Sequence, residues 1–495
     1  MRIEEVFLNL NIDDSVKKIS FKSISEDTRD ISKGDLFFII KRDNFDIFSI
    51  LNDIEYKVSA FVADIKYKNN LKGYIKSKPV IFVKNIKEEF HRVVDFVYGF
   101  NKKDLMFIGI TGTNGKSTTA TMIYYILKSI GEKASLFSTV KNVIGDSVQK
   151  ADFTTPGYLS IRKMLSKIND KERHYVVMEV SSHGIVQQRI KNINFLRCIF
   201  TNLSRDHLDY HKNMENYFKV KKQLFINNKK GISLINIDDR YGRKIFKELD
   251  GSISYGMNLN ADYRAVDITL SNQGSKFRLE SLGKSFNVKT RLCGKYNVFN
   301  CLAAVSTVIS LGYSITKVLD AVSSFNPVEG RLEAILNDVF VDYAHTPDGL
   351  EKVLKTLWEV GYRKIICLLG CGGNRDKGKR KIMGEVASLF ADFSIITSDN
   401  PRNEDPLDIC LQIESGFTTN NYKILLDREQ AIEKALKMFF NFKGQYLDTN
   451  KGKKVCLVVT GKGHEEYQLI GNTKYPFKDA DVIRKIIKKI KCKGA

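Results

Sequence analysis

A glycine-rich segment beginning at residue 111 has the residues needed to bind the phosphates of a nucleotide. Residues 111–119 read Thr-Gly-Thr-Asn-Gly-Lys-Ser-Thr-Thr, after the apolar run Leu105–Ile110 and before a helical pattern at Lys116–Ile130. Glycines let backbone N–H groups approach phosphate oxygens, Lys116 can reach the β- and γ-phosphates, and the Ser117 hydroxyl suits Mg²⁺. The spacing is shorter than in a strict Walker A motif. The strand before and the helix after nevertheless favour nucleoside triphosphate binding over a structural turn.

Two further polar clusters follow predicted strands, where open α/β sheets bind their ligands. Glu179 ends the first of these strands, and an acidic residue there can bind Mg²⁺ directly or through water. A charge that merely ends a strand is the alternative. The segment 201–211 (Thr-Asn-Leu-Ser-Arg-Asp-His-Leu-Asp-Tyr-His) follows the second. Its density of ligating groups favours a metal or phosphate contact over a solvated loop, with His207 as a nitrogen ligand.

Another cluster lies near a predicted domain junction. Residues 342–348 (Asp-Tyr-Ala-His-Thr-Pro-Asp) follow a predicted strand, and Gly330-Arg331 precedes that strand. An arginine at such a junction can neutralise charge on a transferring phosphoryl group, although a structural salt bridge is the alternative. Thr346-Pro347 predicts a helix start, because the hydroxyl can cap the helix and proline suits its first position.

Three turns near the C-terminus combine glycines with charged residues. They are 370–376 (Gly-Cys-Gly-Gly-Asn-Arg-Asp), 399–402 (Asp-Asn-Pro-Arg) and 461–465 (Gly-Lys-Gly-His-Glu), and each follows a predicted strand. Arginine pairs with carboxylates in a bidentate manner, and a glutamate attracts an ammonium group. These turns therefore predict a pocket for a zwitterion.

The order of predicted elements indicates an α/β protein with three domains. Residues 1–103 contain short strand-like runs and little helical periodicity, which favours a small α/β recognition module. Residues 104–331 alternate strands with helices and predict a central P-loop ATPase domain with a mostly parallel sheet. Residues 332–495 repeat the alternation on a smaller scale and predict a Rossmann-like domain. The predicted strands are Asp35–Ile40, Ala60–Ala63, Pro79–Val83, Leu105–Ile110, Tyr175–Val180, Cys198–Thr201, Ser233–Ile237, Val339–Tyr343, Lys364–Leu369, Phe393–Thr397, Lys423–Leu426 and Val455–Thr460.

Composition narrows the class of protein and its partners. The chain has 495 residues, of which 43% are hydrophobic and 27% charged. It contains no long apolar run and no secretory signal, so we expect a cytoplasmic protein without membrane insertion, and a monomer. Eight cysteines without a Cys-x-x-Cys spacing predict reduced thiols, not disulfides or a zinc site. The net charge of +22 is spread along the chain, which favours anionic small substrates over nucleic acid.

Together these motifs resemble those of the Mur ligases, and specifically their MurE type. The resemblance covers the whole chain, from the Asp27-Thr28-Arg29 stretch to the Gly-Lys-Gly-His-Glu motif. It implies an ATP-dependent ligase of peptidoglycan precursor synthesis, which joins an amino acid to the carboxylate of UDP-MurNAc-L-Ala-D-Glu. That carboxylate first takes the γ-phosphoryl group of ATP, and two Mg²⁺ ions and Lys116 would offset the repulsion between the anions. The amine of the amino acid then attacks the acyl phosphate.

The resemblance also implies roles for single residues. Ser117 and Glu179 would bind one Mg²⁺, and His207 would serve the second together with Lys221. Without the resemblance, the segment 217–225 is interpreted as a basic surface helix. In the family the lysine that matches Lys221 is carbamylated, which turns a cation into an anionic group that organises the metal.

The remaining matched positions belong to three substrates. For ATP they are Gly112, Thr113, Asn114, Gly115, Lys116, Ser117, Thr118, Asn297, Asn300 and Arg331, with Asp342 also near the nucleotide. For the UDP-MurNAc-dipeptide they are Thr28, Thr154, Thr155, Ser181, Gln187 and Arg189. For the amino acid they are Arg375, Asp399, Asn400, Arg402, Gly461 and Glu465. The Asp-Asn-Pro-Arg form resembles selection of meso-diaminopimelate, since Arg402 can pair with a second carboxylate that lysine lacks. L-lysine and lanthionine stay open as alternatives.

The sequence departs from the family pattern at three places. The turn at residues 42–47 lacks both family glycines, Asn374 replaces an aspartate, and Lys478 stands where an aspartate is usual.

Three other classes of protein are alternatives to this one. A folylpolyglutamate-type ligase would leave the Asp-Asn-Pro-Arg and Gly-Lys-Gly-His-Glu motifs unexplained. A basic P-loop ATPase that binds nucleic acid would show a steep salt dependence of binding. It would leave the predicted C-terminal pocket unexplained. A binding protein without activity is disfavoured because Lys116 and the metal-binding set are present.

Overall fold

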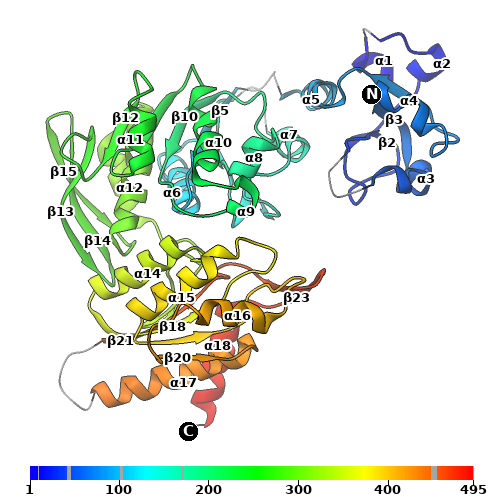
Figure 1. Cartoon of the computed structure of the whole chain (residues 1–495). Helices are drawn as coiled ribbons and strands as arrows, with labels where there is room; N and C mark the ends of the chain where they lie inside the picture. The colour runs from blue at the N-terminus through cyan, green and yellow to red at the C-terminus, as the bar shows by residue number, and fades with distance from the viewer. Residues whose placement is uncertain (9, 42–45, 101–103, 169–171, 448–453, 494–495) are drawn as a thin grey trace. The chain divides into compact units, whose positions relative to one another are not determined.

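The structure, a computed structural model, describes residues 1–8, 10–41, 46–100, 104–168, 172–447 and 454–493 (Figure 1). By packing, the chain divides into two units. The first comprises Met1–Leu105, Pro156–Arg173 and Gln188–Asn192, and the second comprises Met106–Thr155, His174–Gln187 and Ile193–Ala495. Two segments that the sequence assigned to the central domain thus pack with the N-terminal residues. Of the unusual turn at 42–47, residues 42–45 lie outside the described residues.

The N-terminal unit is built on a four-stranded parallel sheet in the order β1-β2-β3-β4. Its strands are β1 (Ile24–Ser25), β2 (Asp35–Phe38), β3 (Val58–Asp64) and β4 (Val80–Val83), and its helices are α1 (Ile3–Val6), α2 (Asp14–Lys17), α3 (Leu51–Ile54), α4 (Lys68–Leu71), α5 (Ile86–Val97) and α7 (Tyr158–Leu165). The expectation of little helical periodicity was wrong for α5. Its buried Ile86, Phe90, Val93 and Val94 have helical spacing, and the Asn85 side chain caps its first turn.

A buried arginine explains why α7 and residues 188–192 belong to this unit. Arg162, on α7, is fully buried, and its Nε donates to Asp95 Oδ1 of α5 at 2.9 Å. Its Nη2 donates to the carbonyl oxygen of Lys191 at 2.7 Å. The guanidinium carbon also lies 3.7 Å from the ring centre of Tyr158 and 4.1 Å from that of Phe100. A buried charge is tolerated only when it is paired in this way, so these contacts hold three distant segments together.

The second unit begins with an eleven-stranded sheet in the order β15-β14-β13-β12-β11-β10-β5-β9-β6-β7-β8. Parallel pairing runs from β12 through β11 and β10 to β5, and joins β9 to β6, in agreement with the predicted mostly parallel sheet. Strands β6 and β12 were not among the predicted strands. The antiparallel strands β13 to β15 at one end, and β7 and β8 at the other, were not predicted. The strands are β5 (Leu105–Thr111), β6 (Ala134–Phe137), β7 (Lys141–Ile144), β8 (Ser147–Lys150), β9 (His174–Glu179), β10 (Phe195–Phe200), β11 (Ile232–Asn236), β12 (Ile253–Gly256), β13 (Tyr263–Ser271), β14 (Gly274–Ser281) and β15 (Lys284–Thr290).

Helices α6 and α12 pack together against this sheet. Both contribute to one buried apolar cluster, which includes Ile123 and Ile126 of α6 and Val298 and Leu302 of α12. The helices of this part are α6 (Lys116–Ser129), α8 (Ser182–Val186), α9 (Leu208–His211), α10 (Met214–Ile226), α11 (Arg240–Phe246), α12 (Lys295–Ser310) and α13 (Ile315–Ser324). The strand, loop and helix predicted around the glycine segment are thereby confirmed.

A six-stranded sheet in the order β16-β17-β21-β18-β19-β20 forms the rest of the second unit, and only β16 pairs in the antiparallel sense. Figure 1 shows α14 and α15 on one face of the sheet and α17 and α18 on the other, and two separate apolar clusters fill these interfaces. The elements are β16 (Glu333–Leu336), β17 (Val339–Asp342), α14 (Pro347–Glu359), β18 (Tyr362–Leu369), α15 (Gly378–Phe390), β19 (Phe393–Ile396), α16 (Pro406–Glu414), β20 (Tyr422–Ile424), α17 (Arg428–Leu447), β21 (Lys454–Thr460), β22 (Tyr467–Ile470), β23 (Thr473–Pro476) and α18 (Asp479–Lys493). Thr346 caps α14 as predicted, accepting from Gly349 N at 3.1 Å.

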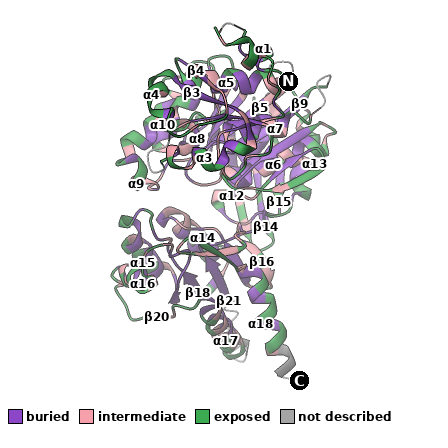
Figure 2. Ribbon diagram, turned by 90° about the vertical axis from the view of Figure 1, so that its right-hand side faces the viewer, coloured by how far each residue is buried: buried purple, intermediate pink, exposed green. Residues whose placement is uncertain are grey.

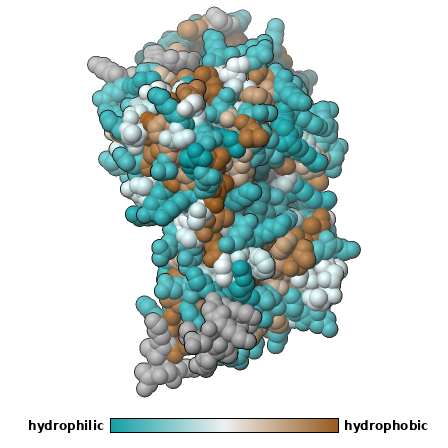
Figure 3. All heavy atoms as spheres, turned by 90° about the vertical axis from the view of Figure 1, so that its left-hand side faces the viewer, coloured by the Kyte–Doolittle hydropathy of each residue, from teal (hydrophilic) through white to brown (hydrophobic). Residues whose placement is uncertain are grey.

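The distribution of side chains fits the predicted α/β class. Every run predicted as a strand overlaps a strand, and Figure 2 shows the strands of the sheets as largely buried ribbons with exposed residues on the outer helices. The face in Figure 3 is mostly hydrophilic, with hydrophobic residues scattered over it. Within the described ranges, no helix has the length and apolar character needed to cross a bilayer. The seven cysteines whose side chains are described are free thiols.

Candidate active site

The glycine loop between β5 and α6 has a backbone that only glycine supports. Gly112 and Gly115 have φ angles of 147° and 85°. A Cβ atom on Gly112 would lie 2.0 Å from Thr201 Oγ1, and one on Gly115 would lie 2.3 Å from Asn300 Oδ1. Both glycines are therefore required by conformation and by close approach, as expected of a loop that brings its backbone near a ligand.

The loop that follows β10 accepts hydrogen bonds from the backbone of the glycine loop. Thr113 N donates to Asn202 O at 2.8 Å, and Asn114 N donates to Asn202 Oδ1 at 3.0 Å. Lys116 Nζ donates to the carbonyl oxygens of Gly112 at 3.1 Å and Thr113 at 2.8 Å. Burial lowers the pKa of Lys116, and the nearby charge of Glu179 opposes that effect. The ammonium group is thus held within the loop that would receive a phosphate chain.

Three side chains around one cavity have the chemistry of Mg²⁺ ligands. Ser117, Glu179 and His207 line a cavity of about 180 Å³ together with Lys116 and Arg331. Ser117 Oγ accepts from Arg331 Nη2 at 3.0 Å. The described residues contain no group of three or more His, Cys, Asp or Glu side chains arranged to hold a metal by themselves. The hydroxyl and the carboxylate are oxygen ligands that fit Mg²⁺, which usually takes few protein ligands and completes its shell with water and phosphate oxygens. The imidazole of His207 would add a nitrogen at the edge of this site.

Glu179 is oriented by a neighbouring threonine. The backbone N–H of Thr139 donates to Glu179 Oε1 at 2.7 Å, and the Thr139 hydroxyl donates to Oε2 at 3.1 Å. Glu179 ends β9 and is fully buried. Both carboxylate oxygens therefore have a donor on one side, which fixes the direction in which their remaining lone pairs point.

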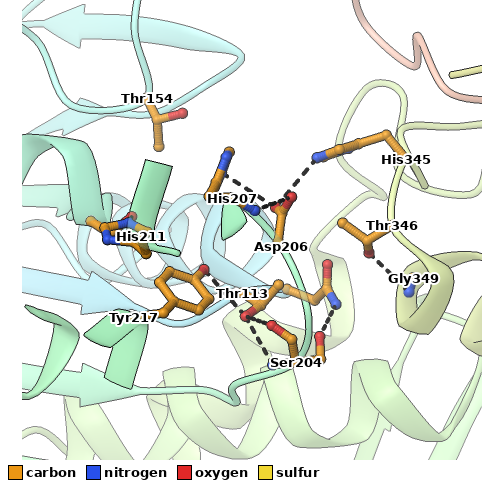
Figure 4. A network of polar contacts seen from close by, with 12 residues as sticks. Thr113, Thr154, Ser204, Asp206, His207, His211, Tyr217, His345, Thr346 and Gly349 are labelled. Carbon is orange, nitrogen blue, oxygen red and sulfur yellow. Dashed lines mark hydrogen bonds and ion pairs between the residues drawn. The ribbon is translucent and has the colours of Figure 1, made fainter. Parts of the chain in front are cut away.

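His207 is held by the residue before it, Asp206 (Figure 4). Its Nε2 lies 3.3 Å from Asp206 Oδ2, and its backbone has a φ of 54° in the left-handed region. His345, from the loop before α14, approaches the same carboxylate at 3.8 Å, so two imidazoles face one aspartate. Burial lowers the pKa of His207 to about 3 against the opposing charge of Asp206. The ring is neutral near physiological pH, which leaves a nitrogen able to bind a metal.

The structure corrects the interpretation of α10 as a surface helix. Lys221 has only 1% of its surface exposed, and its Nζ donates to the carbonyl oxygen of Gly112 at 2.9 Å. The Tyr217 hydroxyl lies 3.3 Å from Thr113 Oγ1, and the Lys221 ammonium lies 4.9 Å from the Tyr217 ring centre. Burial, aided by the charge of Lys116, lowers the pKa of Lys221 well below its ordinary value. This helix therefore presents a deprotonable amine beneath the glycine loop.

The predicted nucleotide residues of α12 and of the segment before β17 also reach this region. Arg331 bonds Ser117 as described, and its guanidinium lies 4.7 Å from the ring centre of Tyr343. Asp342 accepts from the backbone N–H of Leu332 at 2.6 Å and of Ala344 at 2.7 Å, and burial raises its pKa to about 6. Asn300 Nδ2 donates to Asn297 Oδ1 at 2.9 Å. Asn300 lines the cavity, as do Thr118, Asp342 and Gly115.

The residues predicted for the UDP-MurNAc-dipeptide are divided between the units. Thr154, Thr155, Ser181 and Gln187 belong to the second unit, whereas Thr28 and Arg189 belong to the N-terminal unit. Thr155 Oγ1 lies 3.0 Å from Ser181 Oγ and donates to the Glu179 carbonyl oxygen at 2.9 Å. Thr154 Oγ1 lies 3.1 Å from Thr139 Oγ1. Thr154, Thr155 and Ser181 thus form a hydroxyl-rich edge beside Glu179.

The loops after β18, β19 and β21 bring the predicted amino-acid residues together. Asn400 Nδ2 donates to Glu465 Oε2 at 2.8 Å. Arg402, with a φ of 53°, donates through Nη1 to the carbonyl oxygen of Gly373 at 2.7 Å. A Cβ atom on Gly461 would lie 2.5 Å from Asp399 Oδ2. Burial lowers the pKa of Arg402, and the charge of Arg375 adds to that effect, as expected for neighbouring guanidinium groups.

One contact in this region escaped sequence reasoning. Asp348 Oδ2, in the first turn of α14, accepts from Asn114 Nδ2 at 2.6 Å and from Ser204 Oγ at 3.1 Å. The motif 342–348 contains Asp348, but the sequence does not indicate this contact, because Asn114 is 234 positions away in the chain. The signal available was its place directly after a helix cap in a segment full of polar residues.

The glycine loop, the donor side chains around the cavity and the charged loops after β18, β19 and β21 are the regions for which the sequence predicted binding of ATP, Mg²⁺ and an amino acid. The Mur ligase middle domain model matches residues 110–308, and the model for the Mur ligase, glutamate ligase domain matches residues 330–441. The UDP-N-acetylmuramoyl-L-alanyl-D-glutamate–2,6-diaminopimelate ligase 1 of Clostridium acetobutylicum is 38% identical, over 95% of this chain and 96% of that protein. The corresponding ligase of Clostridium tetani is 37% identical, over 99% of this chain and 100% of that protein.

A solved structure of a UDP-N-acetylmuramoyl-L-alanyl-D-glutamate–2,6-diaminopimelate ligase matches with a TM-score of 0.64 and 27% identity, over 99% of both chains. The chain therefore belongs to the Mur ligase family of ATP-dependent, amide-bond-forming ligases.

Proposed function

We propose that this ligase adds meso-diaminopimelate to UDP-MurNAc-L-Ala-D-Glu in the cytoplasm, as a step of peptidoglycan precursor synthesis. The observation that carries the proposal is the gathering of two guanidinium groups and two carboxylates, from Arg375, Arg402, Asp399 and Glu465, in the loops after β18, β19 and β21. Diaminopimelate has one more carboxylate than lysine, and a second arginine gives that carboxylate a partner. The names of the relatives support the same substrate.

The first chemical step is the activation of the dipeptide carboxylate. A carboxylate oxygen attacks the γ-phosphorus of ATP, the bond to the β-phosphate oxygen breaks, and ADP leaves. Lys116 and Arg331 neutralise charge on the transferring group, because both cations line the cavity beside the glycine loop. Mg²⁺ ions, held by Ser117, Glu179 and His207 with a modified Lys221, would supply further neutralisation when bound. Thr155 and Ser181 would position the dipeptide next to this centre.

The second step forms the amide bond. The neutral amine of the amino acid attacks the acyl carbon and its nitrogen loses a proton. The tetrahedral oxyanion then collapses, the bond from carbon to the phosphate oxygen breaks, and inorganic phosphate leaves. Asp399 and Glu465 would hold the ammonium group that does not react, with Asn400 orienting Glu465. Arg375 and Arg402 would hold the carboxylates. Their role is to orient the nucleophile, which converts binding into a gain in rate.

We propose that Lys221 is carbamylated in the active enzyme. A neutral lysine amine adds to the carbon of CO₂ and loses a proton, giving a carbamate anion. Two observations support this: the amine is buried, and burial disfavours its protonated form. A carbamate would also remove the electrostatic repulsion between Lys116 and Lys221, and it would offer oxygen atoms to a metal.

The test of the proposed function is phosphate release from ATP with UDP-MurNAc-L-Ala-D-Glu. Meso-diaminopimelate, L-lysine and lanthionine are added separately, and the product masses are recorded. Release together with a diaminopimelate-containing product supports the proposal. Turnover with lysine or lanthionine alone would retain the ligase but replace its substrate, and no turnover with any of the three would reject the proposal.

We expect Arg402→Ala to weaken discrimination between diaminopimelate and lysine. The loss of a charge-assisted pair should lower kcat/KM for diaminopimelate by about ten- to hundredfold, while turnover of lysine changes much less. The measurement is kcat/KM for each amino acid, with the exposed Arg363 changed to alanine as a matched control in the same domain. An unchanged ratio between the two amino acids would show that Arg402 does not select the substrate.

A further inference from the structure

A fully buried lysine lies inside the proposed amino-acid pocket without a role in the mechanism above. Lys462, in the loop after β21, has 0% of its surface exposed. Its Nζ donates to Glu465 Oε2 at 3.0 Å and to Asn400 Oδ1 at 3.1 Å. It also lies 4.0 Å from Asp399 Oδ1. The ammonium group therefore contacts three of the side chains proposed to bind the substrate.

The hydrogen bonds of Lys462 determine which way the Asn400 amide faces. Asn400 Oδ1 accepts from Lys462 and from the backbone N–H of Leu469 at 2.8 Å, so Nδ2 is left to donate to Glu465 Oε2. Glu465 Oε2 thus receives two donors, one from Lys462 and one from Asn400. Both hydrogen bonds go to Oε2, so Oε1 of Glu465 is left for another partner.

Lys462 also balances charge in the pocket. Burial raises the pKa of Glu465 and the charge of Asp399 adds to this, while Lys462 and Asn400 oppose both. Two carboxylates this close disfavour each other's ionisation unless a cation lies between them. Together with Lys462, the charged side chains proposed to bind the amino acid comprise three cations, counting Arg375 and Arg402, and two carboxylates. Asp376, in the same loops, is paired with Arg205 instead. That excess of one positive charge complements an amino acid with two carboxylates, one ammonium and one neutral reacting amine.

We propose that Lys462 is a positioning and specificity-determining residue: it holds Asn400 and Glu465 in place for the distal ammonium of the substrate and sets a pocket charge that matches a dicarboxylic amino acid. The inference rests on the proposed function, because it assumes that these loops bind the amino acid. A buried ammonium group needs hydrogen-bond partners wherever it lies, and those of Lys462 are two of the proposed ligand-binding side chains. The burial of its charge has a cost, which is tolerated because the partners are correctly placed.

The test compares Lys462→Met with the wild type in steady-state ligation. Wild-type enzyme is first assayed with diaminopimelate, lysine and lanthionine, and the amino acid that it uses is then varied. We expect KM for that amino acid to rise by about ten- to hundredfold in Lys462→Met. KM for ATP and for the UDP-linked dipeptide should change by less than about twofold, the range typical of remote substitutions. Lys474→Met is the matched control. Lys474 is exposed, and both its Nζ and that of Lys462 lie over the Tyr467 ring, at 4.6 Å and 5.8 Å from the ring centre.

A double-mutant cycle with Glu465→Gln separates positioning from simple structural support. If Lys462 acts through Glu465, the double variant should have nearly the KM of Glu465→Gln alone. KM effects that multiply, or a fall in kcat with KM for the amino acid unchanged, would overturn the inference. Should Lys462→Met fail to fold, the comparison of Glu465→Gln with the double variant still decides, since Lys462 keeps Asp399 at 4.0 Å in the first and is absent from the second. A wild type that uses none of the three amino acids would reject the proposed function and this inference together.

Discussion

Lys116→Ala is expected to abolish ligation, with a loss in kcat of about 10²- to 10³-fold or more. The reason is electrostatic, because phosphoryl transfer brings the anionic dipeptide carboxylate to the anionic γ-phosphate. The Lys116 ammonium is held inside the glycine loop by two carbonyl oxygens, where it can exchange those partners for phosphate oxygens. The measurement is phosphate release under saturating substrates, together with nucleotide binding by calorimetry.

Lys128→Ala is the matched control for this variant. Lys128 lies on the same helix, α6, but is exposed near its C-terminal end. The control should retain full activity, which separates loss of the phosphate contact from loss of the helix. Full ligation by Lys116→Ala would mean that the glycine loop does not bind the transferring phosphate.

Lys221→Ala should fail by a comparable factor, about 10²- to 10³-fold, but unlike Lys116→Ala it should be partly rescued by acetate or formate. Removal of the buried side chain leaves space beneath Gly112, where a small carboxylate can stand in for the carbamate. We would measure ligation as a function of added carboxylate, with chloride at equal ionic strength as the reference. The intact mass of the wild-type protein, measured with and without bicarbonate, reports the carbamate directly.

The control for Lys221 is Lys219→Ala on the same helix. Lys219 is exposed on α10, so its loss should change activity little and show no response to acetate. Unchanged activity of Lys221→Ala would remove Lys221 from the metal site. A loss that no carboxylate restores would instead favour a structural role for the buried ammonium beneath Gly112.

Local features of the site were predictable because their causes lie within a few residues. The Thr346 cap, the proline at the start of α14 and the left-handed glycines of the phosphate loop follow from backbone geometry, which neighbouring residues determine. The grouping of polar residues at strand ends was also predictable, because the strands of a parallel sheet all bring their carboxyl ends to one edge. Sequence reasoning failed for α5, whose helical spacing in a short, polar segment was overlooked.

The antiparallel strands at the ends of the central sheet were not predicted, for a different reason. Strand pairing depends on which segments meet. The strands β13 to β15 pair in the antiparallel sense at one end of the sheet, and β7 and β8 do so at the other. Alternating strands and helices predicted the parallel part, because a helix between strands enforces it. A run of strands without helices between them was the sign of the antiparallel part, and it was not used.

By itself, the sequence determined the fold class, the phosphate loop and, through its motifs, the family. Only the tertiary structure decided that Lys221 is buried, that Asp348 bonds Asn114, that Lys462 ties Asn400 to Glu465, and that α7 packs with the N-terminal unit. The physical reason is the range of the interactions. Turns, caps and periodicity arise between neighbours in the chain, whereas burial, desolvation and charge pairing depend on residues that only folding brings together.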